Sequence, residues 1–186
     1  MKRRNHHRKT ASDCTRRGAV VVESALVMGI FFVLLFGVFE YCRFLMVLHV
    51  TNNAARDGCR YATVNVGCDP DPMQVAAKKA EILAYIDARM GGVNQNIVGY
   101  TRAVYPCTSA GFALTPPQAV PKSLSSGTPA DPFNPSDSNN PPWNQAAFTE
   151  RIAVTIKGTY QPVTPLLLFL PSSIPINITA VMGSEG

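Results

Sequence analysis

The hydrophobic and polar positions of the chain separate one long apolar segment from a mixed region that follows it. From Ala19 to Phe39 the sequence holds twenty-one residues with a single charge, Glu23. A helix of this length is roughly 31 Å long, which matches the hydrocarbon core of a bilayer. The segment is apolar on every side and would leave no polar face for water. A buried core helix would show the same pattern, but this chain is too short to surround one. We therefore predict a transmembrane helix over 19–39.

After this span the pattern predicts that the helix continues as an amphipathic stalk to residue 66. Arginines alternate with apolar residues over 43–60. Ala55, Cys59 and Ala62 fall at i, i+4 and i+7, and such a stripe of small residues lets another helix or a sheet approach closely. We interpret it as an intramolecular packing face in preference to a partner site. Gly67 and the proline-containing run 69–72 are expected to end the helix.

The remaining sequence predicts a second helix and about three strands. Residues 74–90 place their apolar side chains on one side, and Gly91-Gly92 stops the helix. Alternating apolar positions predict strands at 151–160 and 174–180, with a weaker one at 96–105.

Two segments have no such periodicity. Eight prolines fall between Pro116 and Pro142, and a composition of this kind cannot bury enough surface to fold alone. We expect 106–142 to be either a mobile surface loop or an exposed binding loop, tacked to the domain by Phe133 and Trp143. The apolar run 166–170 is too short to span a bilayer, so it belongs either to the core or near the membrane surface.

Charge is concentrated at the N-terminus. Residues 1–18 hold seven of the seventeen Lys and Arg but only one of the twelve acids, so without them the net charge changes from +5 to −1. The basic pI is therefore a property of this leader and gives no reason to expect a nucleic-acid partner. The positive-inside rule keeps 1–18 in the cytoplasm and sends Glu40 onward across the membrane. A cleaved secretory signal would need small residues after the span, where Phe39-Glu40-Tyr41 stand, so we predict a retained anchor.

The residues around the start of the span resemble a known family. Arg17-Gly18-Ala19, with Glu23 five residues past the glycine and an apolar run behind it, resembles the processing signature of type IV pilins and pseudopilins. The continuations FGVFEYCR at 36–43 and NAARDGCRYA at 53–62 are similar to the TadE-like pseudopilins of tight-adherence (Flp) pilus systems. The resemblance covers about a quarter of the chain.

The resemblance implies a pilin-like α+β fold, in which a long N-terminal transmembrane and stalk helix carries a small extracytoplasmic domain of a second helix and an antiparallel sheet. The expected divisions are the leader 1–18, the TadE-like helix 19–66 and the domain 67–186. It also implies that a prepilin peptidase cuts between Gly18 and Ala19 at the cytoplasmic face. Without that resemblance, Gly18 would simply break structure before the helix.

Cleavage suggests a role for Glu23. A carboxylate inside hydrocarbon costs at least a few kcal/mol, and the cut would create a free amine on Ala19, one turn away. The hypothesis is that Glu23 of one subunit pairs with the Ala19 amine of its neighbour and fixes the stagger of packed helices. The alternative is that Glu23 sits at the headgroup level, near a helix N-terminus that favours negative charge.

The implied function is that of a minor pseudopilin, used in assembling a tight-adherence (Flp, type IVb) pilus or related secretion machinery. Its implied partners are the prepilin peptidase, other pilin and pseudopilin subunits, the assembly platform of the bacterial inner membrane, and lipid. It would be a single-pass protein of that membrane with a cytoplasmic N-terminus, and would reach the extracellular pilus if it enters the fibre. The competing hypothesis is an uncleaved, single-pass anchored domain that binds an extracytoplasmic partner.

The cysteines and other reactive residues predict a disulfide but no catalysis. Cys68 and Cys107 lie in proline-containing loops outside the helices, so we pair them, with Cys59–Cys68 as the competitor. Such a bridge would contribute about 3–4 kcal/mol on the chain-entropy model. Cys42 lies at the membrane boundary. No metal-ligand spacing and no catalytic motif is present in the sequence, so we expect neither an enzyme nor a cofactor or metal.

Overall fold

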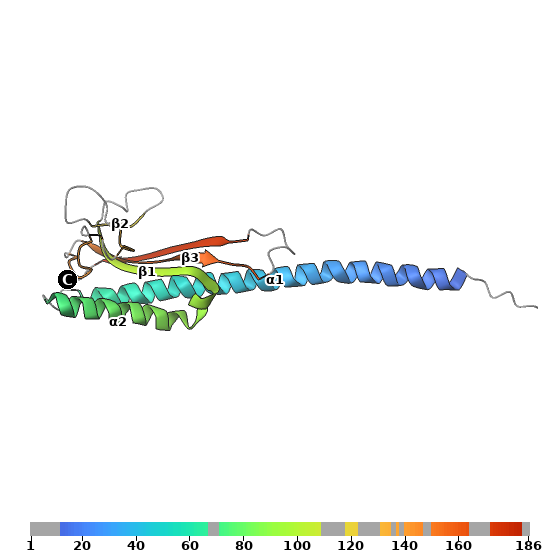
Figure 1. Cartoon of the computed structure of the whole chain (residues 1–186), viewed down its shortest axis with the longest axis horizontal. Helices are drawn as coiled ribbons and strands as arrows, with labels where there is room; N and C mark the ends of the chain where they lie inside the picture. The colour runs from blue at the N-terminus through green and yellow to red at the C-terminus, as the bar shows by residue number, and fades with distance from the viewer. Residues whose placement is uncertain are drawn as a thin grey trace, which may run out of the picture.

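The computed structural model describes residues 12–66, 71–108, 118–122, 131–134, 137, 140–146, 150–163 and 172–183. It contains two α-helices, a short 3₁₀ turn and four strands (Figure 1). In chain order these are α1 (Ser12–Val64), α2 (Pro72–Met90), η1 (Val93–Asn96), β1 (Ile97–Thr108), β2 (Val120–Pro121), β3 (Arg151–Tyr160) and β4 (Ile174–Gly183). The predicted α+β architecture with a long stalk helix is confirmed.

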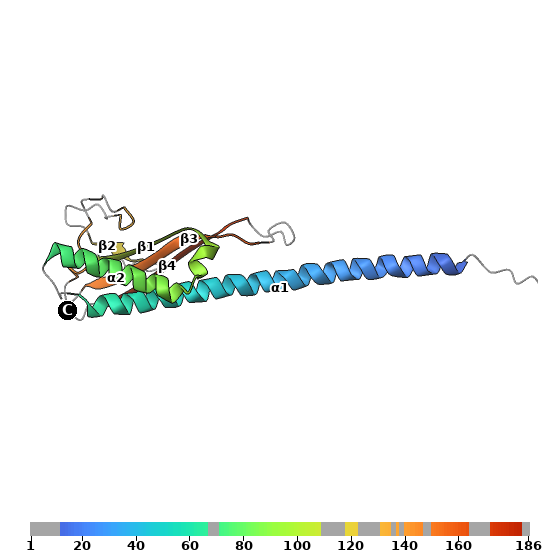
Figure 2. The ribbon, with the colours of Figure 1, turned by 60° about the horizontal axis from the view of Figure 1, so that its bottom comes forward.

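The helix α1 runs unbroken for 53 residues. Its N-terminal half extends away from the domain with no other helix or strand beside it, and its C-terminal half packs against α2 and the sheet (Figures 1 and 2). It begins at Ser12, before the Ala19 expected from the sequence. Residues 12–17 contain no proline, and Gly18 costs a helix only about 1 kcal/mol relative to alanine, so propagation continues through it.

The helix α2 has well-formed ends. The Asp71 side chain accepts a hydrogen bond from the Met73 backbone N–H at 3.0 Å, and Pro72 occupies the first helical turn, where no N–H is required. At the other end Gly91 adopts a left-handed conformation, φ 56°, and its N–H bonds the Ala88 carbonyl. This is the predicted glycine stop, and the helix begins two residues earlier than expected because proline and the aspartate cap favour that position.

The four strands form one antiparallel sheet in the order β2-β1-β3-β4. In its register Val104 lies opposite Val154, which in turn lies opposite Ala180. The pairing of β1 with β3 shifts between Val98 and Thr101, where Gly99 has φ +65°, a conformation that favours glycine in a bulge. The three predicted strands are confirmed, and β1 and β4 each extend three residues further.

Both helices cover the same face of the sheet. The stripe of Ala55, Cys59 and Ala62 is completely buried in the core, which confirms it as an intramolecular packing face. A Cβ atom on Gly58 would overlap the Ile86 side chain of α2, so this glycine sets how closely the two helices approach. The helix-facing core also contains the inward residues of three strands: Ile97, Val104, Ile152, Val154, Ile156, Tyr160, Ile176 and Ala180.

The opposite face of the sheet carries a smaller cluster, against which Ala119 and Phe133 of the proline-rich stretch pack. Trp143 of the same stretch lies in the helix-facing core instead. Trp143 is 2% exposed and donates its indole N–H to the Val75 carbonyl at 3.1 Å, which confirms that it attaches this stretch to the domain. The two-residue strand β2, which pairs with the end of β1, was not predicted. The apolar run 166–170 and residues 67–70 lie outside the described residues.

Candidate functional site

The N-terminal half of α1 presents a continuous apolar surface that the described chain does not cover. Its most apolar window has a mean hydropathy of 2.6, and none of that window is buried. Val21 is 68% exposed and Phe31 is 53% exposed. Among the described residues α1 is the one helix long and apolar enough to cross a membrane. Such a surface in contact with water would be strongly unfavourable, so it is a candidate single-pass anchor.

The three residues predicted for processing and pairing lie together on this exposed part of α1. Gly18, Ala19 and Glu23 are all exposed, and a Cβ on Gly18 would meet no atom within 4 Å. Gly18 lies inside the helix rather than before it. Nothing in the described residues bonds the Glu23 side chain, so any partner for its carboxylate comes from outside this part of the chain.

A polar cluster stands where the apolar span ends. Glu40 is only 7% exposed. Its carboxylate accepts a hydrogen bond from the Tyr160 hydroxyl at 2.6 Å and a second from the Val163 backbone N–H at 3.2 Å. These bonds satisfy the buried carboxylate, which would otherwise be costly. They also attach the end of β3 to the helix one residue after the predicted span.

Arg43 and Phe44, from the next turn of α1, complete this boundary cluster. The Arg43 guanidinium donates to the Asn96 side-chain oxygen at 2.8 Å and lies 5.9 Å from the centre of the Tyr160 ring. Phe44 packs against the same ring, with 5.5 Å between ring centres. Burial, and then the hydrogen bond to Glu40, raise the pKa of Tyr160 to about 12, so this phenol remains a hydrogen-bond donor at any physiological pH.

This cluster was not predicted from the sequence. Glu40 was identified only as the first residue beyond the span, and its partner Tyr160 follows 120 positions later. The cluster could have been inferred from the position of Glu40, which lies on the same side of the helix as the apolar core residues. An acid there requires a buried donor.

The stalk motif NAARDGCRYA divides between two sides of α1. Its small residues Ala54, Ala55 and Cys59 are buried. Arg56 and Arg60, one turn apart, are exposed. The buried half of the motif therefore accounts for close packing of the domain on the stalk, whereas the arginines face away from the core.

The described cysteines are buried thiols apart from exposed Cys42. The Cys59 thiol donates to the Ile152 carbonyl at 3.2 Å, and burial raises its pKa to about 12. Burial also raises the pKa of Cys107 to about 11. Cys68 lies outside the described residues, so the pairing of Cys68 with Cys107 stays a prediction. No cluster of three or more His, Cys, Asp or Glu side chains able to hold a metal occurs in the part of the chain that the structure describes.

Comparison with known proteins agrees with the N-terminal assignment. A family model described as "TadE-like protein" matches residues 18–60, the segment that contains the exposed anchor, the boundary cluster residues of α1 and most of the stalk motif. The match confirms the resemblance to TadE-like proteins over that segment. No curated protein matches the chain, and no solved structure matches it.

Proposed function

From the TadE-like character of residues 18–60, we propose that this chain is a minor pseudopilin of a tight-adherence pilus or related secretion machine. It is held in the bacterial inner membrane by α1, cut after Gly18 by a prepilin peptidase, and recruited into assembly by helix packing. The observation that carries the proposal is an uncovered apolar helix with one acid near its start, in the segment that the family matches.

The free-energy cost of placing Glu23 in the membrane supports this proposal. A carboxylate in hydrocarbon costs at least a few kcal/mol, and no described residue of its own chain bonds it. A cationic partner on another copy would offset that cost. Cleavage provides such a partner in the new Ala19 amine, and pairing it with Glu23 of a neighbour shifts two parallel helices by about 6 Å, four residues at about 1.5 Å each.

The shape of the molecule is consistent with storage in a membrane followed by assembly. No residue of 19–39 is buried by the described part of the chain, and the boundary cluster attaches the domain from Glu40 onward. Residues 19–39 can therefore pack against lipid or against other helices. The basic leader places the N-terminus in the cytoplasm by the positive-inside rule. In this proposal the chain is a structural component, not an enzyme.

The mature N-terminus tests the proposal. Mass spectrometry of the native protein should find a chain that begins at Ala19 in cells with the peptidase, and at Met1 in cells without it. Gly18→Val should block the cut, because the added side chain hinders binding of the peptide in a narrow cleft. Gly29→Val is the matched control on the same exposed helix and should be processed normally.

A full-length chain in peptidase-positive cells would overturn processing and favour the second candidate, an uncleaved anchored binding domain. That candidate draws its support from a groove on the outer face of the sheet, which parts of the proline-rich stretch border.

A further inference from the structure

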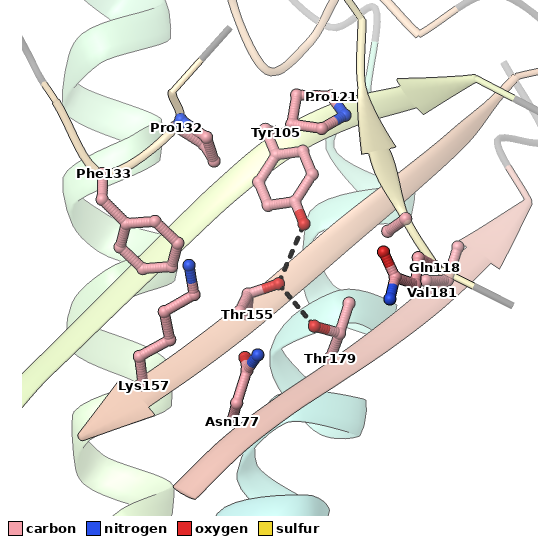
Figure 3. Close-up of a pocket in the computed structure, with 11 residues that line it drawn as sticks. Tyr105, Gln118, Pro121, Pro132, Phe133, Thr155, Lys157, Asn177, Thr179 and Val181 are labelled. Atoms are coloured by element: carbon pink, nitrogen blue, oxygen red, sulfur yellow. Dashed lines mark hydrogen bonds between the residues drawn. The ribbon is translucent and has the colours of Figure 1, made fainter. Parts of the chain in front are cut away.

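The sheet face that the helices leave open carries a groove of about 670 Å³. Its floor is made of outward-facing side chains of β1, β3 and β4, and its rim of residues 118–121 together with Pro132 and Phe133 (Figure 3). The volume falls within the roughly 300–1,000 Å³ common for small-molecule sites. Neither the processing site nor the boundary cluster touches it.

A chain of three hydroxyls crosses the floor. The Tyr105 hydroxyl lies 2.9 Å from the Thr155 hydroxyl, which lies 2.8 Å from that of Thr179 (Figure 3). Burial raises the pKa of Tyr105, so all three hydroxyls keep their hydrogens at neutral pH. Two of these three hydrogens make the two bonds.

The two ends of this chain differ in exposure. Tyr105 and Thr155 are 7% and 2% exposed, whereas Thr179 is exposed. Either hydroxyl of each pair can be the donor. In both directions the Thr179 hydroxyl retains capacity for a further hydrogen bond, as donor or as acceptor, with a ligand in the groove.

The groove also carries a positive charge, and the described residues that line it include no acid. The Lys157 ammonium sits 4.1 Å from the centre of the Phe133 ring, an arrangement that holds a cation by its attraction to the ring face. The amides of Asn177 and Gln118 flank the hydroxyls (Figure 3), and each offers both a donor and an acceptor.

We propose that this groove binds an acidic saccharide, with the sugar carboxylate on Lys157 and the sugar hydroxyls on Thr179, Asn177 and Gln118. A sugar has polar edges and C–H faces, which suits a wall of hydroxyls and amides beside proline and phenylalanine. An extended peptide would need a row of backbone groups at a sheet edge, but the groove lies on a sheet face. A nucleotide phosphate would favour a glycine-rich turn or a helix N-terminus, and the described lining residues include neither.

The test measures binding to the full chain in nanodiscs of neutral lipid, by calorimetry. The probe is a tetrasaccharide that contains glucuronic acid, compared with the same tetrasaccharide after its carboxyl groups are reduced to alcohols. Lys157→Gln should weaken binding of the acidic probe by about tenfold or more, the effect of losing one charge-assisted contact. It should leave binding of the reduced probe little changed.

Matched variants separate the groove from general charge. Arg56→Gln removes one positive charge from the exposed stalk and should not change binding. Thr179→Val should weaken both probes alike. The proposal is overturned if the acidic tetrasaccharide does not bind the wild-type chain, if it binds no better than its reduced form, or if Lys157→Gln and Arg56→Gln have the same effect. Binding of an acidic peptide in preference to the saccharide would also overturn it. None of these outcomes depends on cleavage after Gly18.

Discussion

Glu23 places a carboxyl group on a helix surface that is otherwise apolar and that the described chain leaves uncovered. Its environment is therefore set by whatever packs on that helix. A neighbouring amine stabilises the charged form, and water at the headgroup level does so as well, but only the amine creates a preferred axial offset between copies. The two interpretations differ in what happens when the charge is removed.

Glu23→Gln should insert into the membrane at least as well as the wild type, because an amide is easier to bury than a carboxylate. We expect it to fall about tenfold or more in the sheared pilus or assembly fraction, since it cannot pair with the Ala19 amine. Immunoblots of membrane and sheared fractions measure both effects. Ser24→Ala, which removes only a hydroxyl bonded to its own helix at 2.8 Å, should assemble normally. Normal assembly of Glu23→Gln would contradict the pairing.

Cys59 gives the fold a dependence on alkaline pH. Burial raises its folded pKa from 9.0 to about 12, so the folded chain holds this proton more tightly than the unfolded chain. Its stabilising contribution is complete below pH 9 and is lost as the pH rises toward 12. The free energy of unfolding should therefore fall from pH 9 to 11, by an amount that is smaller in Cys59→Ala. Denaturant titrations of both chains in detergent, under reducing conditions, measure the difference. Equal slopes in the two chains would contradict it.

The close packing of α1 against α2 depends on Gly58, which has no side chain. Gly58 lies where α1 and α2 approach closely, and the Ile86 side chain fills the space that a Cβ would need. The buried small residues Ala55, Cys59 and Ala62 keep the backbone of α1 near the sheet. The stalk motif is therefore a contact surface for the domain.

Gly58→Val should destabilise the domain by about 1–3 kcal/mol, the usual effect of overpacking a core. Thermal unfolding followed by near-ultraviolet circular dichroism reports it. Gly29→Val, on the uncovered half of α1 with no atom within 4 Å of its added Cβ, should leave the domain transition unchanged. Adding Ile86→Ala to Gly58→Val should recover part of the loss if the overlap with Ile86 is the cause; no recovery would point to another contact.

The elements were predictable where their patterns are local. Residues 151–160 alternate cleanly and form β3 over that range, and 74–90 is amphipathic and lies within α2. The strand β2 was missed because two residues in a proline-rich stretch carry no periodicity. The start of α1 was expected at Ala19 because the apolar run and the expected cleavage point both begin there, whereas the helix extends back to Ser12 through Gly18, whose propensity cost is small.

At the scale of the whole molecule, the contacts that orient the domain on the anchor could not be predicted. The hydrogen bond between Glu40 and Tyr160 joins residues 120 positions apart. The groove joins strands to a stretch that was expected to be either a mobile surface loop or an exposed binding loop. Such contacts follow from the register of the sheet and from the side of it that α1 covers. The alternation of apolar residues predicts which side chains share a face of a strand, but it does not predict which strands pair with one another.

Tyr160→Phe should weaken the attachment of the domain to the anchor. It leaves buried Glu40 with one of its two donors, a change that costs about 1–3 kcal/mol, and hydrogen exchange at the Val163 amide should accelerate. Tyr61→Phe is the matched control, because it removes a hydroxyl that bonds the exposed carboxylate of Glu81 and should cost less than about 1 kcal/mol. Equal losses in the two variants would contradict a special role for the boundary cluster.

The strands β3 and β4 lie lengthwise along the C-terminal half of α1 (Figures 1 and 2), and β3 is pinned to the helix at Glu40. A pull on the N-terminal half of α1 along its axis would therefore apply shear to the seam, that is, to the contact between α1 and these two strands. Under shear the contacts along the seam share the tension and must rupture together, whereas under peeling they would open one after another. This arrangement should resist a pull along the helix axis better than a pull across it.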